Sequence, residues 1–224
     1  MLEALKWSHS SLKTYKTCPH LFKQIYILKD RRELPNARLG NALHEYASNL
    51  INKKVNLLDD ILTKWQVSQE DRELVPVAIS HLTQFIETTL AKKRIESEKR
   101  VECQIGPYSF VAVLDIVFNF DDRRHIYDFK FSKSSKYYKE YIQQAKIYNY
   151  IMEKVYGKKP TEVYLYYPIT NEIIPIKDLS LSEDELVSQI ELIIADRKFE
   201  TKTHKLCRFC QYQKDCPAFH IEEP

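Results

Sequence analysis

An aspartate interrupts an otherwise apolar run, FVAVLDIVF, at residues 110 to 118. The run is rich in valine, isoleucine and phenylalanine, which predicts a β-strand. A carboxylate buried in such a strand costs several kcal/mol unless it is paired or binds a cation. Asp115 therefore constrains the fold, because another group has to come close to it.

Asp128 is a candidate for that group, because it lies thirteen residues later on the next predicted strand. The DDRR segment at residues 121 to 124 is typical of a hairpin turn, and such a turn would bring the two carboxylates side by side. Close carboxylates repel each other, and a divalent cation relieves the repulsion. Oxygen ligands of this kind suit Mg²⁺ or Mn²⁺.

Lys130 follows Asp128 by two residues, so both side chains project from the same strand face. A lysine there can orient or deprotonate a water, and it can offset the charge of a phosphoryl transition state. A metal ion, a water and a lysine together form a phosphodiester-cleaving site. The alternative is a structural salt bridge among Asp115, Asp128 and a lysine, and the residues alone leave both interpretations open.

The periodicity of the apolar residues predicts a mixed α/β fold, with helices flanking one central sheet. Pro19 is expected to break the first helix just after Cys18, and Ser68 lies near an expected break in the third. Helices are predicted at 8–27, 37–51, 57–97, 137–156 and 182–199. Strands are predicted at 100–105, 108–120, 124–131, 161–169 and 172–179.

The composition excludes several classes of protein. The three glycines, Gly40, Gly106 and Gly157, are too far apart to form a Walker A loop or a dinucleotide-binding turn. No apolar run reaches the length of a membrane span, and the first residues do not resemble a signal peptide. We therefore expect a soluble, cytoplasmic protein. The net charge of +3 says little about partners, because local clustering matters more than the sum.

Three of the five cysteines crowd the end of the chain, in the pattern Cys207-x2-Cys210-x5-Cys216. This spacing is typical of a metal site, and Cys18 is the candidate for a fourth ligand. Four thiolates suit either zinc or an iron–sulfur cluster, and spacing alone favours zinc as the commoner structural choice. Cys103 remains, and its place in a strand predicts a small buried hydrophobe.

The segment from Lys130 to Glu140 is rich in lysine and tyrosine, with no acid before its last residue. Positive charge interleaved with aromatic rings suits single-stranded nucleic acid, whose bases can stack. The run at 91–100 is also locally basic, but it contains acids, which favours an ordinary solvated surface. The lysine-rich segment after Asp128 is therefore the predicted contact with DNA.

The motifs VAVLDIVF, HIYDFKFSK and QQAKIYNY together resemble the PD-(D/E)XK nuclease superfamily, in its RecB-like branch. That branch places an Asp on one strand, Asp or Glu-x-Lys on the next, and Gln-x-x-x-Tyr on the following helix. RLGNALHEY also matches its Leu-Gly-x-x-x-His context on an early helix. One departure is Ala112, where the family often has glycine.

The resemblance implies a restriction-endonuclease-like fold and a role for each matching residue. His44, Asp115, Asp128 and the Phe129 carbonyl would be metal ligands, with Mg²⁺ or Mn²⁺ as the ion. Lys130 would be catalytic, and Gln144 and Tyr148 would help to hold the lysine or the DNA. Glu102 matches, less closely, a glutamate often seen on the first strand.

The cysteine pattern resembles that of iron–sulfur nucleases of the same branch, which include the CRISPR-associated RecB-like exonucleases and the AddB nuclease domain. The resemblance implies a [4Fe–4S] cluster on Cys18, Cys207, Cys210 and Cys216, where it would join the two ends of the chain. We expect a single domain over 1–224, with a mainly helical part at 1–97, a catalytic sheet core at 98–200 and a cysteine tail at 201–224.

The function implied is a metal-dependent DNA exonuclease acting on single-stranded ends. The implied setting is CRISPR spacer acquisition with an integrase partner, and DNA repair or a viral recombination role comes second. Two alternatives belong to other classes of protein. One is a non-catalytic DNA-binding scaffold subunit, and the other is a zinc-binding regulatory module with an incidental acidic pair.

Overall fold

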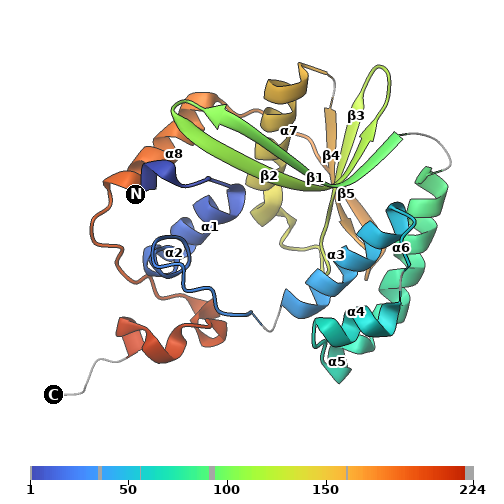
Figure 1. Ribbon diagram of the computed structural model, residues 1–224, viewed down its shortest axis with the longest axis horizontal. Coiled ribbons are helices and arrows are strands. Elements are labelled where there is room, and N and C mark those ends of the chain that lie inside the picture. The colour runs from blue at the N-terminus through green and yellow to red at the C-terminus, as the bar shows by residue number, and fades with distance from the viewer. Residues whose placement is uncertain (1, 35–36, 56, 91–93, 160, 220–224) are drawn as a thin grey trace. The chain divides into compact units, whose positions relative to one another are not determined.

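The computed structural model describes residues 2–34, 37–55, 57–90, 94–159 and 161–219 (Figure 1). Its α-helices are α1 (His9–Thr17), α2 (Pro19–Phe22), α3 (Arg38–Ile51), α4 (Leu58–Lys64), α5 (Gln69–Arg72), α6 (Val75–Leu90), α7 (Ile142–Tyr156) and α8 (Glu183–Ala195). Its strands are β1 (Arg94–Ile105), β2 (Tyr108–Asn119), β3 (Arg124–Phe129), β4 (Thr161–Tyr167) and β5 (Glu172–Ile176). A π-helical turn, Lys23–Ile27, follows α2, and short 3-10 turns occur at Leu2–Ala4, Tyr138–Tyr141, Lys205–Phe209, Gln213–Asp215 and Pro217–Phe219.

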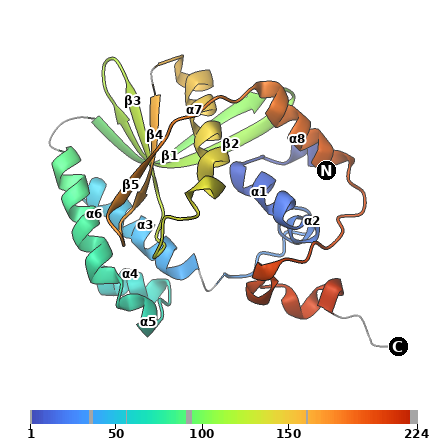
Figure 2. The same ribbon diagram turned by 180° about the vertical axis from the view of Figure 1, so that it is seen from behind.

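The five strands form one mixed sheet in the order β1-β2-β3-β4-β5. β2 and β3 are antiparallel, β3 and β4 are parallel, and β4 and β5 are antiparallel. Parallel neighbours need a long crossover connection, and α7 supplies it between β3 and β4 (Figure 2). The α/β architecture, with a mixed sheet and flanking helices, confirms the predicted fold class.

The chain divides into two compact units, and β1 and β2 contribute residues to both. The first unit contains Met1–Pro35, Glu102–Val111 and Leu181–Pro224, and the second contains Asn36–Val101 and Ala112–Ser180. The division of the chain into a helical part, a sheet core and a tail stays a prediction. No helix in the described segments combines the length and the hydropathy needed to cross a membrane.

The second unit has its core between the sheet and helices α3 and α6. Ala47 and Ile51 of α3 pack with Leu82 and Ile86 of α6 against buried side chains of β2, β3 and β4. Because strand side chains alternate between faces, Phe129 faces this core while Asp128 points to the other face. The same alternation that builds the core therefore turns the acidic residue of β3 away from the apolar cluster.

Aromatic rings form much of the core of the first unit. Trp7 and Phe22 stack with ring centroids 6.0 Å apart, and Phe22 also stacks on Phe199 at 6.1 Å. Gly106 makes the turn between β1 and β2 at φ +55°, where a Cβ atom would come within 2.8 Å of the Val187 side chain. The turn therefore requires glycine, both for its backbone conformation and for the close approach.

The helix boundaries agree with the sequence in most places. Ser8 and Ser182 cap α1 and α8 through their side chains, and α1 ends at Thr17, before Pro19. The helix predicted over 57–97 is wrong at its end, because β1 begins at Arg94; residues 91–93 lie outside the described residues. Strand pairing in the sheet overrides the charged, helix-like composition of this segment.

Candidate active site

The hairpin of β2 and β3 brings the two predicted aspartates together. Ile116 pairs with Tyr127, which places Asp115 beside Asp128. Burial raises the pKa of Asp115, and the two carboxyl groups are close enough for the charge of Asp128 to raise it further. Asp115 Oδ2 also accepts a hydrogen bond of 2.6 Å from the backbone N–H of Phe129. The predicted side-by-side placement of the carboxylates is thus observed, while their roles stay predictions.

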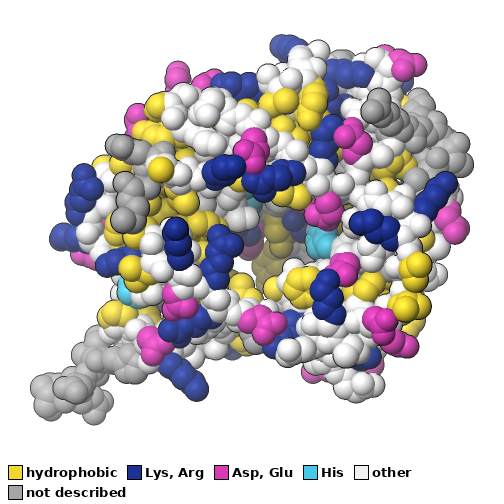
Figure 3. Space-filling view, in the orientation of Figure 1, with side chains coloured by type: hydrophobic (Ala, Val, Ile, Leu, Met, Phe, Trp, Pro, Cys, Tyr) yellow, Lys and Arg dark blue, Asp and Glu magenta, His cyan; other side chains and the backbone are white. Residues whose placement is uncertain are grey.

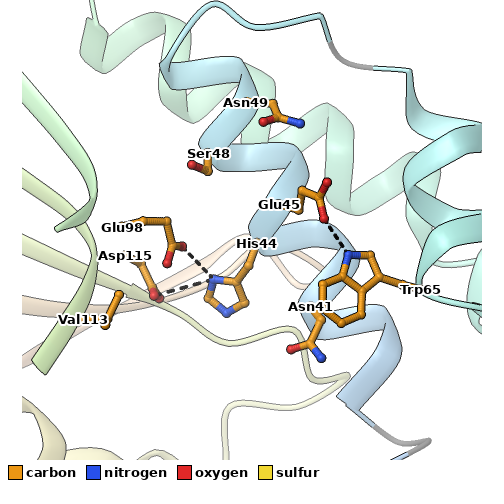
Figure 4. A pocket seen from close by; sticks show the side chains of 9 residues that line it. All are labelled: Asn41, His44, Glu45, Ser48, Asn49, Trp65, Glu98, Val113 and Asp115. Atoms are coloured by element: carbon orange, nitrogen blue, oxygen red, sulfur yellow. Dashed lines mark hydrogen bonds and ion pairs between the residues drawn. The ribbon is translucent and has the colours of Figure 1, made fainter. Parts of the chain in front are cut away.

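His44 reaches the same place from α3. Its Nδ1 atom lies 3.6 Å from Asp115 Oδ1 and 3.9 Å from Glu98 Oε1 (Figure 4). One ligand atom from each of His44, Glu98 and Asp115 lies within 4.8 Å of the other two. In the described part of the chain, no other three His, Cys, Asp or Glu residues meet this distance. An imidazole and two carboxylates at this separation form a donor set that suits a divalent ion.

Glu98 is the member of this group that the sequence did not reveal. It lies on β1 in a left-handed conformation, with φ 48°, which is uncommon for a residue other than glycine. Its side chain remains 43% exposed at the edge of the group. Glu102, the glutamate suggested by the resemblance, forms an exposed ion pair with Lys6 at 3.0 Å.

Lys130 is held in a chain of polar contacts that passes through α7 and ends on β2. Its Nζ atom forms an ion pair with Asp128 and donates a hydrogen bond of 3.0 Å to Gln144 Oε1. Gln144 Nε2 donates to the Tyr148 hydroxyl at 2.8 Å, which donates to the Val113 carbonyl at 2.8 Å. The four-residue spacing of Gln144 and Tyr148 puts them on one helix face, and the structure shows them in contact.

The electrostatics of the site follow from this crowding. Burial and the Asp128 carboxylate raise the pKa of Asp115 well above its usual range, and burial and Asp115 raise the pKa of Glu98. Burial lowers the pKa of His44, which keeps the imidazole neutral and able to bind a metal ion. A cation would stabilise the ionised form of both carboxyl groups.

Lys130 stays charged in this setting. Burial acts to lower the pKa of its ammonium group, but the carboxylates of Asp128 and Asp115 outweigh burial and raise that pKa. An ammonium group cannot accept a proton from water. Of the two roles predicted for Lys130, the placement therefore favours the stabilisation of developing negative charge.

The four cysteines of the predicted cluster all belong to the first unit. Burial raises the pKa of the Cys210 thiol, and Cys18, Cys207 and Cys216 lie near enough to raise it further. The Cys207 Sγ atom accepts a hydrogen bond of 3.2 Å from the His204 backbone N–H. Cys103 is partly exposed rather than buried, although Val101 and Ile105 on the same strand are buried, so its predicted place in a core is wrong.

The lysine- and tyrosine-rich segment is exposed where it leaves the site. Lys133, Lys136 and Lys139 are all exposed to solvent. The Lys136 ammonium lies 4.8 Å from the ring centroid of Tyr137, whose side chain is also exposed. On the face shown in Figure 3, basic and acidic side chains are interspersed.

Fold and site together define a class of protein. A mixed α/β sheet carries an acidic pair on a hairpin, a lysine two residues beyond the second acid, and a helical histidine facing the first. This is the arrangement of a restriction-endonuclease-like nuclease fold. A profile of the PD-(D/E)XK nuclease superfamily matches residues 6–217, and the chain belongs to that superfamily.

Comparisons with individual proteins bear on the fold. A crystal structure from Eubacterium rectale, described as that of a candidate exonuclease, matches with a TM-score of 0.54 at 12% identity, covering 100% of this chain and 89% of that chain. A structure named SSO0001 covers 86% of this chain and 90% of that chain, at 16% identity and a TM-score of 0.48. No curated protein matches the chain. Members of the superfamily use divalent metal ions, and a nuclease domain implies DNA as the substrate.

Proposed function

We propose that this protein is a metal-dependent deoxyribonuclease that removes nucleotides from single-stranded DNA ends. The observation that carries the proposal is the convergence of His44, Glu98 and Asp115 within 4.8 Å, beside a buried Lys130–Asp128 pair. Superfamily membership supports the hydrolytic chemistry. The name of the Eubacterium rectale neighbour supports the preference for ends.

His44, Asp115, Asp128 and the Phe129 carbonyl would hold the divalent ion, and Glu98 lies where it can join them. When bound, the ion supplies Lewis-acid chemistry at the scissile phosphate. A water attacks phosphorus and the bond to the 3′ oxygen breaks, which leaves a 5′-phosphate and a 3′-hydroxyl. Lys130 stabilises the negative charge that develops, and Gln144 keeps the ammonium in place.

The four cysteines would hold a structural [4Fe–4S] cluster. The pattern Cys207-x2-Cys210-x5-Cys216 with a distant Cys18 supports the cluster over zinc through its resemblance to that of iron–sulfur nucleases. The role of the cluster would be to fasten the segment around Cys18 to the tail.

For the cellular role, the cysteine pattern favours CRISPR spacer acquisition alongside an integrase, with repair or recombination second. The resemblance of the motifs to those of CRISPR-associated RecB-like exonucleases supports this role. A cytoplasmic location fits both roles.

Digestion of oligonucleotides labelled at the 5′ or the 3′ end tests the nuclease proposal. Single- and double-stranded substrates are incubated with Mg²⁺ or Mn²⁺ and protein purified without oxygen. We expect stepwise shortening of single strands by the wild type and none by Asp115→Asn, which retains an acceptor for the Phe129 N–H. Glu102→Gln serves as the control and should cleave normally, because Glu102 pairs with Lys6. Cleavage by Asp115→Asn at the wild-type rate would refute the proposed site.

A further inference from the structure

A cavity of about 500 Å³ opens beside the candidate metal site. One end is formed by His44, Glu98, Asp115 and Val113, and Trp65 and the polar face of α3 line the rest (Figure 4). Ligand pockets in proteins have volumes of roughly 300 to 1,000 Å³. The cavity is thus large enough for one nucleoside next to the reacting phosphate.

The indole of Trp65 is fixed in place at the edge of this cavity. Its Nε1–H donates a hydrogen bond of 2.7 Å to Glu45 Oε2. The Lys64 ammonium pairs with the same carboxylate at 2.7 Å, and this pairing lowers the pKa of Glu45. A ring that is already oriented loses little side-chain entropy when a ligand stacks on it. Trp65 therefore presents an oriented indole to this cavity.

Two amide side chains on α3 line the same cavity and can form hydrogen bonds with a ligand. Asn41 and Asn49 flank Glu45 at four-residue intervals, so all three share one helix face. Neither amide side chain hydrogen-bonds to another described residue, whereas the indole and Glu45 are already paired. Each amide offers both donors and acceptors, which match the edge of a nucleobase.

The charge of this cavity differs from that of a second cavity, which also has His44 in its lining. The second cavity, also about 500 Å³, is lined by Lys130, Lys133 and Tyr141, among others. The first cavity carries the carboxylates of Glu45, Glu98 and Asp115, whereas the second has one carboxylate, that of Asp71, beside its two lysines. A phosphate backbone is attracted to Lys130 and Lys133, whereas no lysine or arginine is among the described residues that line the first cavity. The backbone is thus directed to the second cavity, and the uncharged part of a nucleotide fits the first.

We propose that the first cavity binds the base of the nucleotide next to the scissile phosphate, stacked on Trp65 and hydrogen-bonded to Asn41 or Asn49. This inference rests on the proposed function and gives it a reason to prefer single strands. A base can enter the cavity only when it is unpaired, because a paired base is stacked inside a duplex. A duplex end has to fray before its terminal nucleotide can bind.

Fluorescence tests the pocket without requiring cleavage. The chain has two tryptophans, and Trp7 is fully buried, so Trp65 is the indole that a ligand can reach. Short oligothymidylate and an abasic oligomer of equal length are titrated in Ca²⁺ in place of Mn²⁺. We expect saturable quenching by oligothymidylate alone, and an affinity for it roughly 5- to 100-fold above that for the abasic oligomer.

Labelled oligomers and Trp65 variants provide a second measurement. By fluorescence anisotropy, Trp65→Ala should bind the two oligomers alike, while Trp65→Phe should retain part of the preference. Equal affinities in the wild type, or an unchanged preference in Trp65→Ala, would overturn the pocket.

The same variants separate this inference from the nuclease proposal. If the wild type cleaves DNA and Trp65→Ala does so with the same KM, the base-binding pocket is refuted and the nuclease proposal stands. If oligothymidylate quenches the wild-type fluorescence but the wild type cleaves nothing in Mn²⁺, the nuclease proposal is refuted and base binding in the cavity is retained.

Discussion

Substitution of Lys130 by methionine should destabilise the metal-free protein, because it leaves a buried carboxylate without its partner. The Asp128 side chain is only 4% exposed and the Lys130 side chain 13%, and the two form an ion pair. Removal of one member of a buried pair typically costs about 3 to 5 kcal/mol. In a chain of this size each kcal/mol lowers Tm by about 2 to 4 °C, so we expect a fall of about 6 to 20 °C.

The assay is thermal unfolding in EDTA, carried out as a double-mutant cycle. Lys130→Met combined with Asp128→Asn removes the unpaired charge, and we expect it to recover most of the lost Tm. Lys6→Met is the matched control, because Lys6 and Glu102 form an exposed pair that contributes at most about 1 kcal/mol. Additive losses in the double variant, or an unchanged Tm in Lys130→Met, would refute the assigned pairing. Mn²⁺ should restore part of the stability of Lys130→Met if Asp128 is a ligand.

Further predictions concern metal binding, the hydrogen-bond chain that holds Lys130, and the cysteines. By calorimetry, Glu98→Gln should bind Mn²⁺ about tenfold more weakly or worse, and Glu102→Gln should bind it normally; equal affinities would remove Glu98 from the site. The raised pKa of Asp115 means that more of this carboxyl is protonated at a given pH, so Mn²⁺ binding should release a proton and tighten as the pH rises. A pH-independent affinity would contradict that reasoning. Tyr148→Phe leaves the Val113 carbonyl without its donor and should cost about 1 to 3 kcal/mol in chemical denaturation, whereas an unaltered unfolding midpoint would show that the contact contributes nothing. Cys210→Ser should lose bound iron and visible colour in metal analysis and absorbance, and stoichiometric zinc in the wild type would exclude the cluster.

The acidic pair could be predicted from the sequence because its signal is local. An aspartate in an apolar strand needs a partner, and a hairpin of fixed register offers one thirteen residues away. The contact between Gln144 and Tyr148 follows equally from helical spacing. His44 is different, since a lone histidine on a helix carries no such signal, and the family pattern was needed to single it out.

Glu98 was missed because its surroundings look like solvated surface. The segment AKKRIESEKR mixes charges as an exposed helix does, although β1 begins within it at Arg94. The alternation of Ile95, Val101 and Ile105 with polar residues was the available signal for a strand. Even that signal would not place the Glu98 carboxylate, because a left-handed residue disturbs the regular alternation. Trp65 and the α3 amides could not be placed from the sequence either, because their cavity arises only from tertiary packing.

Anomalous diffraction from crystals of the wild-type protein grown with Mn²⁺ would test the central claim most directly. The claim is that carboxylates from neighbouring strands and a helical imidazole enclose one divalent ion beside Lys130. We predict an anomalous peak within coordination distance of His44 and Asp115, with Asp128 and the Phe129 carbonyl completing the ligands. A cleavage-competent crystal form with its manganese elsewhere, or with none between these groups, would contradict the account.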